Sequence, residues 1–421
     1  MTTKVSSLRT SDIGVLGERN MRWYLGGQLV SLTGTMLQSA VLSLLIIKLT
    51  GKTDAAYWVG VVWALGLLPG IFLGPFAGVF LDRSNKKNIL IVTGLLGIAQ
   101  ALTLAYLTHV GRITIAEINL LAVLMGIVNA IDGPGRNAII KDAVLHAHNV
   151  RKASKMFTSL YNLAQVAGPG LAGFLVLSFG YSFTFVLNAL SFVALIVALL
   201  KMKFIPRVFE TASAETEKRG TWNLVRSGGR YILSEPSIAI CVVLTSVVWA
   251  FGFSYYAILA VIARDMFNGN PIVYSHLAAS SGVGSFLGAL VVIKFDERFS
   301  HTFLVAGGAF LAGTALFVLS KMGSVHPAMV LVAATGFSLM VCFSTLRSSI
   351  IHLARQELTG VVMGFTFTFF YGGMMLGSFG AGYIANRFGC STELSICGVA
   401  LGITGLSVPL LPGVKRLNKK N

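Results

Sequence analysis

Residues 57–81 read YWVGVVWALGLLPGIFLGPFAGVFL and hold no charged side chain over 25 positions. A helix of about 20 apolar residues spans the roughly 30 Å hydrocarbon core of a bilayer. Comparable apolar segments recur along the whole chain, among them residues 89–108, 174–200, 238–263 and 303–319. A spanning segment must satisfy its backbone hydrogen bonds internally, which favours helices. The sequence therefore predicts an all-α integral membrane protein.

The composition fits a chain embedded in lipid. The 421 residues are 55% hydrophobic and only 12% charged, whereas a soluble domain carries about 25% charged residues. The net charge is +17, and the basic residues gather in alternate loops between the apolar segments. This positive-inside pattern puts both termini in the cytoplasm. Since no basic patch with interleaved aromatic residues lies outside these loops, we expect no nucleic-acid partner.

The sequence holds no pattern typical of a catalytic or metal site. The cysteines lack the spacing of metal ligands, so we expect them to fill the core. We find no Walker loop, no metal cluster and no credible Ser/His/Asp set, and we therefore expect no enzyme activity, no cofactor and no metal. The four cysteines are Cys241, Cys342, Cys390 and Cys397.

The apolar segments divide into six and six. Residues 206–234 form the only sizeable polar interruption, with the composition of a linker. We expect a cytoplasmic N-terminal segment (1–22), two six-helix halves (23–203 and 236–411), a cytoplasmic linker (204–235) and a cytoplasmic tail (412–421). The twelve predicted helices are 23–48, 57–82, 89–109, 116–140, 155–178, 181–203, 236–263, 272–294, 301–320, 327–351, 359–386 and 391–411.

The two halves resemble each other in sequence. The stretch GPFAG at 74–78 recurs as GSFLG at 284–288, 210 positions later, and RNAII at 136–140 recurs as RSSII at 347–351, 211 positions later. Phe179-Gly180 recurs as Phe388-Gly389, 209 positions later. Three matches in one order at nearly one offset indicate a duplication. In transporters built this way, the substrate site lies between the halves near the bilayer midplane.

The sharpest motif is GVFLDRSNKK at residues 78–87. It resembles the major facilitator superfamily signature G-x-x-x-D-R-x-G-R-K, with Asn85 in place of a glycine. The resemblance covers the whole chain and implies the major facilitator fold of twelve helices in two halves. It also implies that Asp82 faces the start of the eleventh helix near Gly360, and that Lys86 faces Asp142. The gating motif would comprise Gly74, Gly78, Asp82, Arg83, Lys86 and Asp142; the alternative is a turn with positive-inside anchors.

Residues 167–173, AGPGLAG, resemble the G-P-x-x-G-G motif of the superfamily's proton-coupled exporters. Pro169 removes a backbone hydrogen bond, and Gly168 and Gly173 permit close packing, so we expect a kinked helix. The resemblance implies export. The alternative is helix packing unrelated to the direction of transport.

Asp132 and Arg136 lie four residues apart and therefore on one face of the fourth predicted helix. Ionisable groups at membrane depth usually face a cavity or a partner, which makes Asp132 the first candidate for a proton carrier. The alternative is a structural pair near the cytoplasmic surface, because the GPG stretch at 133–135 can end the helix. The further coupling candidates are Arg136, its repeat counterpart Arg347, Glu117, Asp265 and His276.

A set of aromatic and polar side chains is available to line a substrate cavity. Each alone is more often a core or lipid-facing residue, but together they fit an amphiphile better than a sugar. The candidates are Gln38, Asn129, Tyr161, Asn162, Gln165, Asn188, Trp249, Phe253, Tyr255, Tyr256, Phe367, Phe370 and Tyr371.

Within the superfamily, the stretches RNAII at 136–140, VRKAS at 150–154 and LTGVVMGF at 358–365 resemble the branch of bacterial siderophore exporters and macrolide efflux pumps. This implies a proton-coupled exporter of a siderophore or amphiphilic drug, working by alternating access in the bacterial cytoplasmic membrane. Its expected partners are a small amphiphilic substrate, protons and membrane lipid, and the expected form is a monomer. The alternatives are an importer or exchanger of a small metabolite, a lysolipid flippase, or a membrane sensor without transport.

Overall fold

The computed structural model holds helices and no strand within the residues it describes, which are 14–51, 53–82, 84–144, 149–202, 221–295, 299–355 and 358–411. Eleven of these helices are long and apolar enough to cross a membrane. The fold class predicted from the apolar segments, an all-α integral membrane protein, is confirmed.

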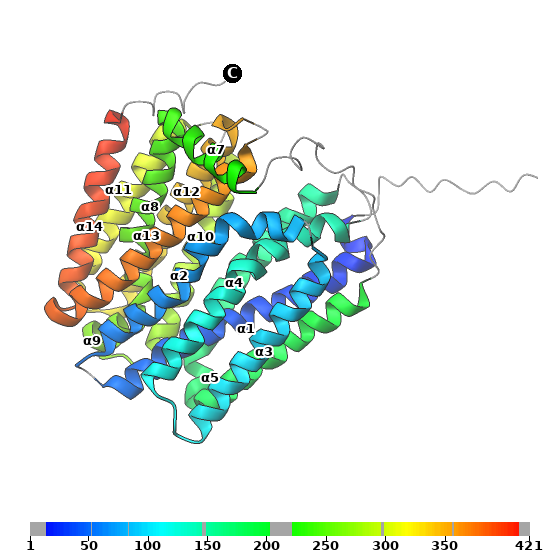
Figure 1. The fold of residues 1–421 in the computed structure, drawn as a ribbon. Helices are drawn as coiled ribbons and strands as arrows, with labels where there is room; N and C mark the ends of the chain where they lie inside the picture. Colours follow the sequence, from blue (N-terminus) through cyan, green and yellow to red (C-terminus); the bar gives the residue numbers. More distant parts are fainter. Residues whose placement is uncertain are drawn as a thin grey trace, which may run out of the picture.

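The helices fall into two groups, and a short amphipathic helix lies between the groups in sequence and at one end of the bundle in space (Figure 1). The N-terminal half comprises α1 (Arg19–Thr50), α2 (Ala55–Asp82), α3 (Lys86–His109), α4 (Ile115–Ala143) and α5 (Asn149–Lys201), with the 3-10 turn η1 (Val15–Gly17) before them. The helix α7 (Thr221–Ser234) follows. The C-terminal half comprises α8 (Pro236–Ala257), α9 (Leu259–Phe267), α10 (Pro271–Phe295), α11 (His301–Leu319), α12 (Val325–Leu353), α13 (Thr359–Phe388), α14 (Cys390–Ser407) and η2 (Val408–Leu410).

The 53-residue α5 is two spanning segments joined at a glycine. Gly180 has φ 82° and ψ 173°, a non-helical conformation that a residue with a Cβ atom rarely adopts. It divides α5 into arms at 149–179 and 181–201, as the predicted boundary between 178 and 181 requires. Counting the two arms separately turns eleven candidate spans into twelve, six in each half. The repeat counterpart Gly389 has φ 87° between α13 and α14, so the duplication extends to backbone geometry.

The fourth predicted helix, 116–140, matches α4: the helix continues through Pro134 to Ala143 and does not end at 133–135, because packed neighbouring helices offset the lost hydrogen bond of a proline. Three other predictions differ from the structure. The predicted helix 236–263 is instead two, since the backbone leaves helical geometry at Ile258. The predicted linker contains the helix α7. The sequence did not predict this helix because it holds Gly228 and Gly229, and glycine disfavours a helix. Finally, α1 begins at Arg19 instead of 23.

The halves meet along two helix pairs, α2 with α13 and α5 with α10. Glycines bring the backbones of each pair together: a Cβ atom on Gly60 would lie 2.5 Å from the carbonyl oxygen of Ser378, and one on Gly173 would lie 2.2 Å from that of Pro271. Both contacts lie at the end of the bundle away from α7. Nearer α7, a Cβ atom on Gly74 would lie 3.9 Å from Thr368 Oγ1. Of these three glycine contacts between the halves, the two close ones lie at the end opposite α7.

Candidate functional site

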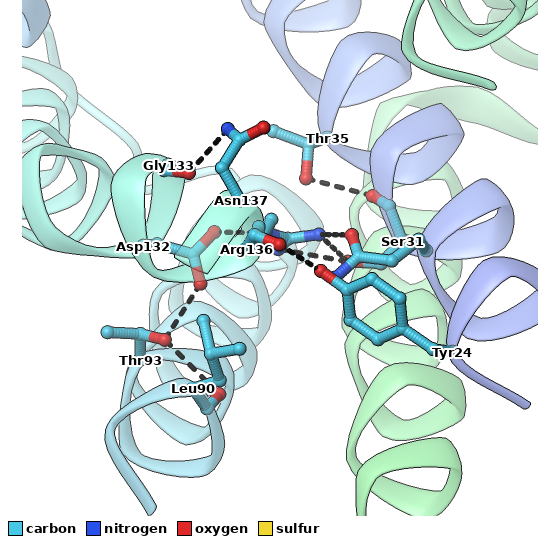
Figure 2. Close-up of polar contacts among 10 residues, drawn as sticks. Tyr24, Ser31, Thr35, Leu90, Thr93, Asp132, Gly133, Arg136 and Asn137 are labelled. Carbon is cyan, nitrogen blue, oxygen red and sulfur yellow. Dashed lines mark hydrogen bonds and ion pairs between the residues drawn. The ribbon is translucent and has the colours of Figure 1, made fainter. Parts of the chain in front are cut away.

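A buried ion pair lies at the centre of the N-terminal half. Asp132 and Arg136 are one turn apart on α4 and are only 6% and 4% exposed. The Arg136 Nε–H donates to Asp132 Oδ2, and Thr93 Oγ1 of α3 donates to Asp132 Oδ1 at 2.8 Å (Figure 2). The predicted pairing on one helix face is therefore present. Because α4 continues past Pro134, the pair lies inside the bundle and not at the end of a helix.

The remaining donors of Arg136 reach across to α1. Its Nη1 donates to Gln28 Oε1 at 2.6 Å, and Nη1 and Nη2 both lie 3.3 Å from Ser31 Oγ. The Tyr24 hydroxyl donates to the backbone carbonyl of Arg136. A buried charge is tolerated only when its hydrogen-bonding groups are satisfied, and here three helices supply the partners. The network thus ties α1, α3 and α4 together through one titratable carboxylate.

Sequence reasoning assigned no site role to the partners of this ion pair. Tyr24, Gln28 and Ser31 recur at positions i, i+4 and i+7 of α1 and therefore form one polar stripe on an apolar helix. That spacing was the available signal. Thr93 gave none, since a single threonine in an apolar helix commonly bonds to its own backbone.

Two predicted cavity residues belong to a second polar cluster inside the same half. Gln38 Nε2 donates to Gln100 Oε1 at 2.9 Å, and Asn188 Nδ2 donates to Gln38 Oε1 at 2.9 Å. Ser191 Oγ donates to Asn188 Oδ1 at 3.0 Å. All four side chains are buried. The amides of Gln38 and Asn188 therefore face each other and join α1, α3 and α5.

An aromatic cluster occupies the junction between the halves. On the C-terminal side, the ring of Trp249 lies 4.7 Å from that of Phe370 and 5.5 Å from that of Phe343. From the N-terminal half, Trp63 on α2 reaches Phe253 at 5.5 Å and Tyr256 at 6.2 Å. The predicted aromatic candidates on α8 and α13 are thus brought together, whereas Trp63 and Phe343 were not foreseen. The Phe370 ring also contacts those of Phe367 and Tyr371.

A small cavity adjoins this cluster between α8, α12 and α13. The side chain of Arg347 is exposed there and makes no hydrogen bond or ion pair within the described part of the chain. Among the residues that the structure describes, Arg347, predicted as a coupling candidate, therefore has no acidic partner comparable to that of Arg136. The other lining residues are Thr245, Phe343, Met363, Thr366, Phe367 and Phe370.

The other cavity candidates are dispersed. Tyr255 is buried, and its hydroxyl lies 2.8 Å from Ser281 Oγ on α10. Tyr161 on α5 is exposed. Asn162 is buried, Gln165 is half-buried and Asn129 is exposed.

The acidic coupling candidates outside α4's centre have local structural roles. Glu117 Oε2 accepts from the Thr114 backbone N–H at 2.7 Å, completing a capping box at the start of α4. Asp265 pairs with Arg264 at 2.5 Å, and Arg264 also donates to the carbonyl of Gly51 at 2.7 Å. His276 is exposed on α10. These contacts give Glu117 and Asp265 structural roles that do not depend on coupling.

Sequence reasoning missed a buried acid in the C-terminal half. Glu393 on α14 is fully buried, and its Oε1 accepts from Cys397 Sγ at 3.2 Å. Its Oε2 has no hydrogen-bond partner within the described residues. It is the only carboxylate in the apolar segment 391–411, and that isolation was the overlooked signal.

The predicted gating motif is described in part. Lys86 Nζ lies 3.0 Å from Asp142 Oδ2, joining the start of α3 to the end of α4 as the resemblance implied. The surroundings of Gly78, the side chain of Asp82 and the whole of Arg83 lie outside what the structure describes. The backbone of Asp82 ends α2, the helix that packs on α13.

The glycine-proline motif of α5 forms helix contacts on two sides. A Cβ atom on Gly168 would lie 2.6 Å from Met36 Cβ of α1. The backbone N–H of Gly173 donates to Ser275 Oγ of α10 at 2.7 Å. The backbone stays helical through Pro169, so the predicted kink is not a break in the helix; the break in α5 is at Gly180. The motif therefore lies between α1 of its own half and α10 of the other half.

Comparisons with known proteins identify chains of similar sequence and fold. The sequence profile of a major facilitator family described as "Transmembrane secretion effector" matches residues 11–418. The chain is 22% identical over 400 residues to the macrolide efflux protein A of Streptococcus pyogenes, covering 94% of this chain and 96% of that protein. It is 24% identical over 265 residues to the staphyloferrin A transporter of Staphylococcus aureus, covering 62% of this chain and 64% of that protein. A solved bacterial homologue of the human lysosomal transporter Spinster, inward-facing and unoccupied, matches with a TM-score of 0.74 at 16% identity over 95% of this chain and 98% of that chain.

Proposed function

Since the chain belongs to the major facilitator family of transmembrane secretion effectors, a family of transporters and not of enzymes, we propose that it is a proton-coupled exporter of a siderophore or amphiphilic drug. The named relatives that support export are a macrolide efflux protein and a staphyloferrin A transporter. The exporter would act as a monomer in the bacterial cytoplasmic membrane, with both termini in the cytoplasm, as the positive-inside pattern indicates.

Transport would proceed by alternating access of the two halves. The close glycine contacts of α2 with α13 and of α5 with α10 seal one end of the bundle. If α7 is cytoplasmic, the sealed end faces outward and cargo enters from the cytoplasm. Lys86 and Asp142, on the α7 side, would belong to the gate that closes in the opposite state. Asp82 would complete that gate through the start of α13.

The observation that carries proton coupling is the buried network of Asp132 and Arg136. While Asp132 is ionised, it neutralises Arg136 and accepts from Thr93. A proton on Asp132 would remove one charge and leave Arg136 held by Gln28 and Ser31 of α1. An unbalanced buried charge costs about 3–5 kcal/mol. Protonation would therefore favour a rearrangement of α1 against α4 that brings Arg136 to water or to a new partner.

Complementation of a deletion strain tests the proposal in the natural host. Deleting the gene under iron limitation should lower secreted chelator, or sensitise the cells to bulky hydrophobic drugs. Wild type and Asp265→Asn, expressed at equal abundance, should restore the phenotype. Asp132→Asn should not restore it, because the amide cannot release a proton. Asp265→Asn is the matched control, since it removes an exposed paired carboxylate far from the network.

Two outcomes would contradict the proposal. Full complementation by Asp132→Asn, together with export that still collapses when the proton gradient is dissipated, would assign coupling to another group. If deletion changes neither chelator secretion nor drug tolerance, and purified protein in liposomes moves a nutrient inward, the importer alternative replaces export.

A further inference from the structure

The internal duplication exposes a difference in charge between the halves. Arg347 is the repeat counterpart of Arg136, 211 positions later. The same offset places Phe343 where the N-terminal half has Asp132. The C-terminal half thus keeps the cation of the pair and replaces its carboxylate with an aromatic ring. Phe343 and Arg347 both lie on α12, one helical turn apart.

Nothing in the described part of the chain neutralises Arg347. Its side chain is exposed and makes no hydrogen bond or ion pair there, in contrast to Arg136, which is buried, paired with Asp132 and hydrogen-bonded to Gln28. The two described carboxylates of the C-terminal half have other contacts: Asp265 pairs with Arg264, and Glu393 accepts from Cys397. A charge at membrane depth is costly unless it faces a partner or a water-filled cavity.

The surroundings of Arg347 have the character of a ligand subsite. The cavity at its side is lined by the rings of Phe343, Phe367 and Phe370 and by the hydroxyl-bearing Thr245 and Thr366. These rings belong to the aromatic cluster that reaches Trp249 and the junction between the halves. A few polar groups set among apolar and aromatic walls are the usual composition of a small-molecule site. A planar guanidinium recognises carboxylates and phosphates by paired hydrogen bonds.

We propose that Arg347 binds an anionic group of the cargo, a carboxylate in the first instance, while the surrounding rings hold its apolar or aromatic body. This inference rests on the proposed transport function and specifies its substrate class as an amphiphilic anion or zwitterion. In this conformation the cavity holds about 10 Å³, the space of a single water, so the anionic group of the cargo would enter it as the lining side chains move apart, with the rest of the cargo along the aromatic cluster. In this arrangement the missing carboxylate at position 343 is supplied by the substrate.

Binding of two matched probes to the purified full-length protein tests the proposal. Dansyl-phenylalanine carries a carboxylate, and its amide is neutral with the same aromatic body. By fluorescence anisotropy, wild type should bind the carboxylate at least about tenfold more tightly than the amide, the increment expected for a charge-assisted hydrogen-bonded pair. Arg347→Gln should remove this preference without weakening binding of the amide. Arg347→Lys should retain part of it, because it keeps the charge but not the paired geometry.

The control variant is Arg112→Gln, which removes an exposed arginine from the loop between α3 and α4 and should leave the preference unchanged. A wild type that does not prefer the carboxylate, or an Arg347→Gln variant that keeps the preference, overturns the inference. Because binding needs neither a proton gradient nor transport, its failure is separable from failure of export. If the wild-type gene complements the deletion but the purified protein does not prefer the carboxylate probe, the anion site alone is contradicted. If the preference exists and depends on Arg347 but deletion gives no export phenotype, the exporter proposal alone is contradicted.

Discussion

Replacing Gly173 by alanine should weaken the seal between the two halves at the end opposite α7. The new Cβ atom would lie 2.2 Å from the carbonyl oxygen of Pro271, 2.5 Å from its carbonyl carbon and 2.7 Å from the backbone nitrogen of Ile272. All three atoms are backbone atoms at the start of α10, so no side-chain rotation relieves the clash. Ordinary contact begins at 3.4 Å, and α5 must therefore separate from α10 by about 3.4 − 2.2 = 1.2 Å.

The expected cost follows from two opposing effects. Overpacking of a close contact costs about 1–3 kcal/mol, and the change from glycine to alanine stabilises a helix by up to about 1 kcal/mol. With the full helix gain subtracted, the net penalty on the sealed conformation is up to about 2 kcal/mol. A penalty of that size changes a conformational equilibrium by up to about 30-fold. Gly173→Ala should thus populate conformations open at this end without unfolding the protein.

Distances between spin labels measure this shift. With the native cysteines replaced, labels at Arg112 and Lys321 report on exposed loops of the two halves at the sealed end. Gly173→Ala should add a longer distance to the wild-type distribution and should reduce transport. Gly170→Ala is the matched control in the same motif, because its Cβ atom would make an ordinary contact of 3.5 Å with Ala279. If Gly173→Ala gave the wild-type distribution, or if Gly170→Ala shifted it equally, the glycine seal would be wrong.

Two further predictions concern the gating motif. A double-mutant cycle of Lys86→Met and Asp142→Asn, followed by thermal unfolding in detergent, should give a coupling energy below about 1 kcal/mol, since both side chains are partly exposed; a larger value would identify the pair as a structural anchor. Asp82→Asn should insert at normal abundance but lose most transport, because it removes the charge proposed to hold α2 against the start of α13. Near-normal efflux by this variant would reduce the motif to a turn with positive-inside anchors.

The apolar segments were sufficient to predict the fold because lipid permits few alternatives to spanning helices. The break at Gly180 followed from the repeat, since Gly389 occupies the same place in the second half. The sequence was less informative where tertiary packing overrides local preference. Pro134 lies inside α4. Gly228 lies inside α7, and a Cβ atom on Gly228 would lie 2.2 Å from the side chain of Val361 of α13. Such contacts are made by residues distant in the chain and have no local signature.

The candidate site could be predicted only where a single helix or a family motif carried it. Asp132 and Arg136 share a helix face, and the pairing of Lys86 with Asp142 followed from the resemblance. The α1 partners of Arg136 could not be paired with it, because they precede it by more than 100 residues. The bonds of Gln38 to Gln100 and Asn188 could not be predicted for the same reason: an amide in an apolar helix fits a cavity and an interhelical bond equally well.

The duplication therefore predicts where residues lie but not what they do. A guanidinium at positions 136 and 347 is common to both halves, whereas the residue one turn earlier is a carboxylate in one and a phenyl ring in the other. In the first half the charge is balanced by Asp132, and we propose that this pair responds to a proton. In the second half the guanidinium has no such partner among the described residues, and we propose that it responds to cargo. The two sites occupy equivalent positions of the duplicated halves. Under these proposals both would shift the same alternating-access equilibrium, as coupling between proton and cargo requires.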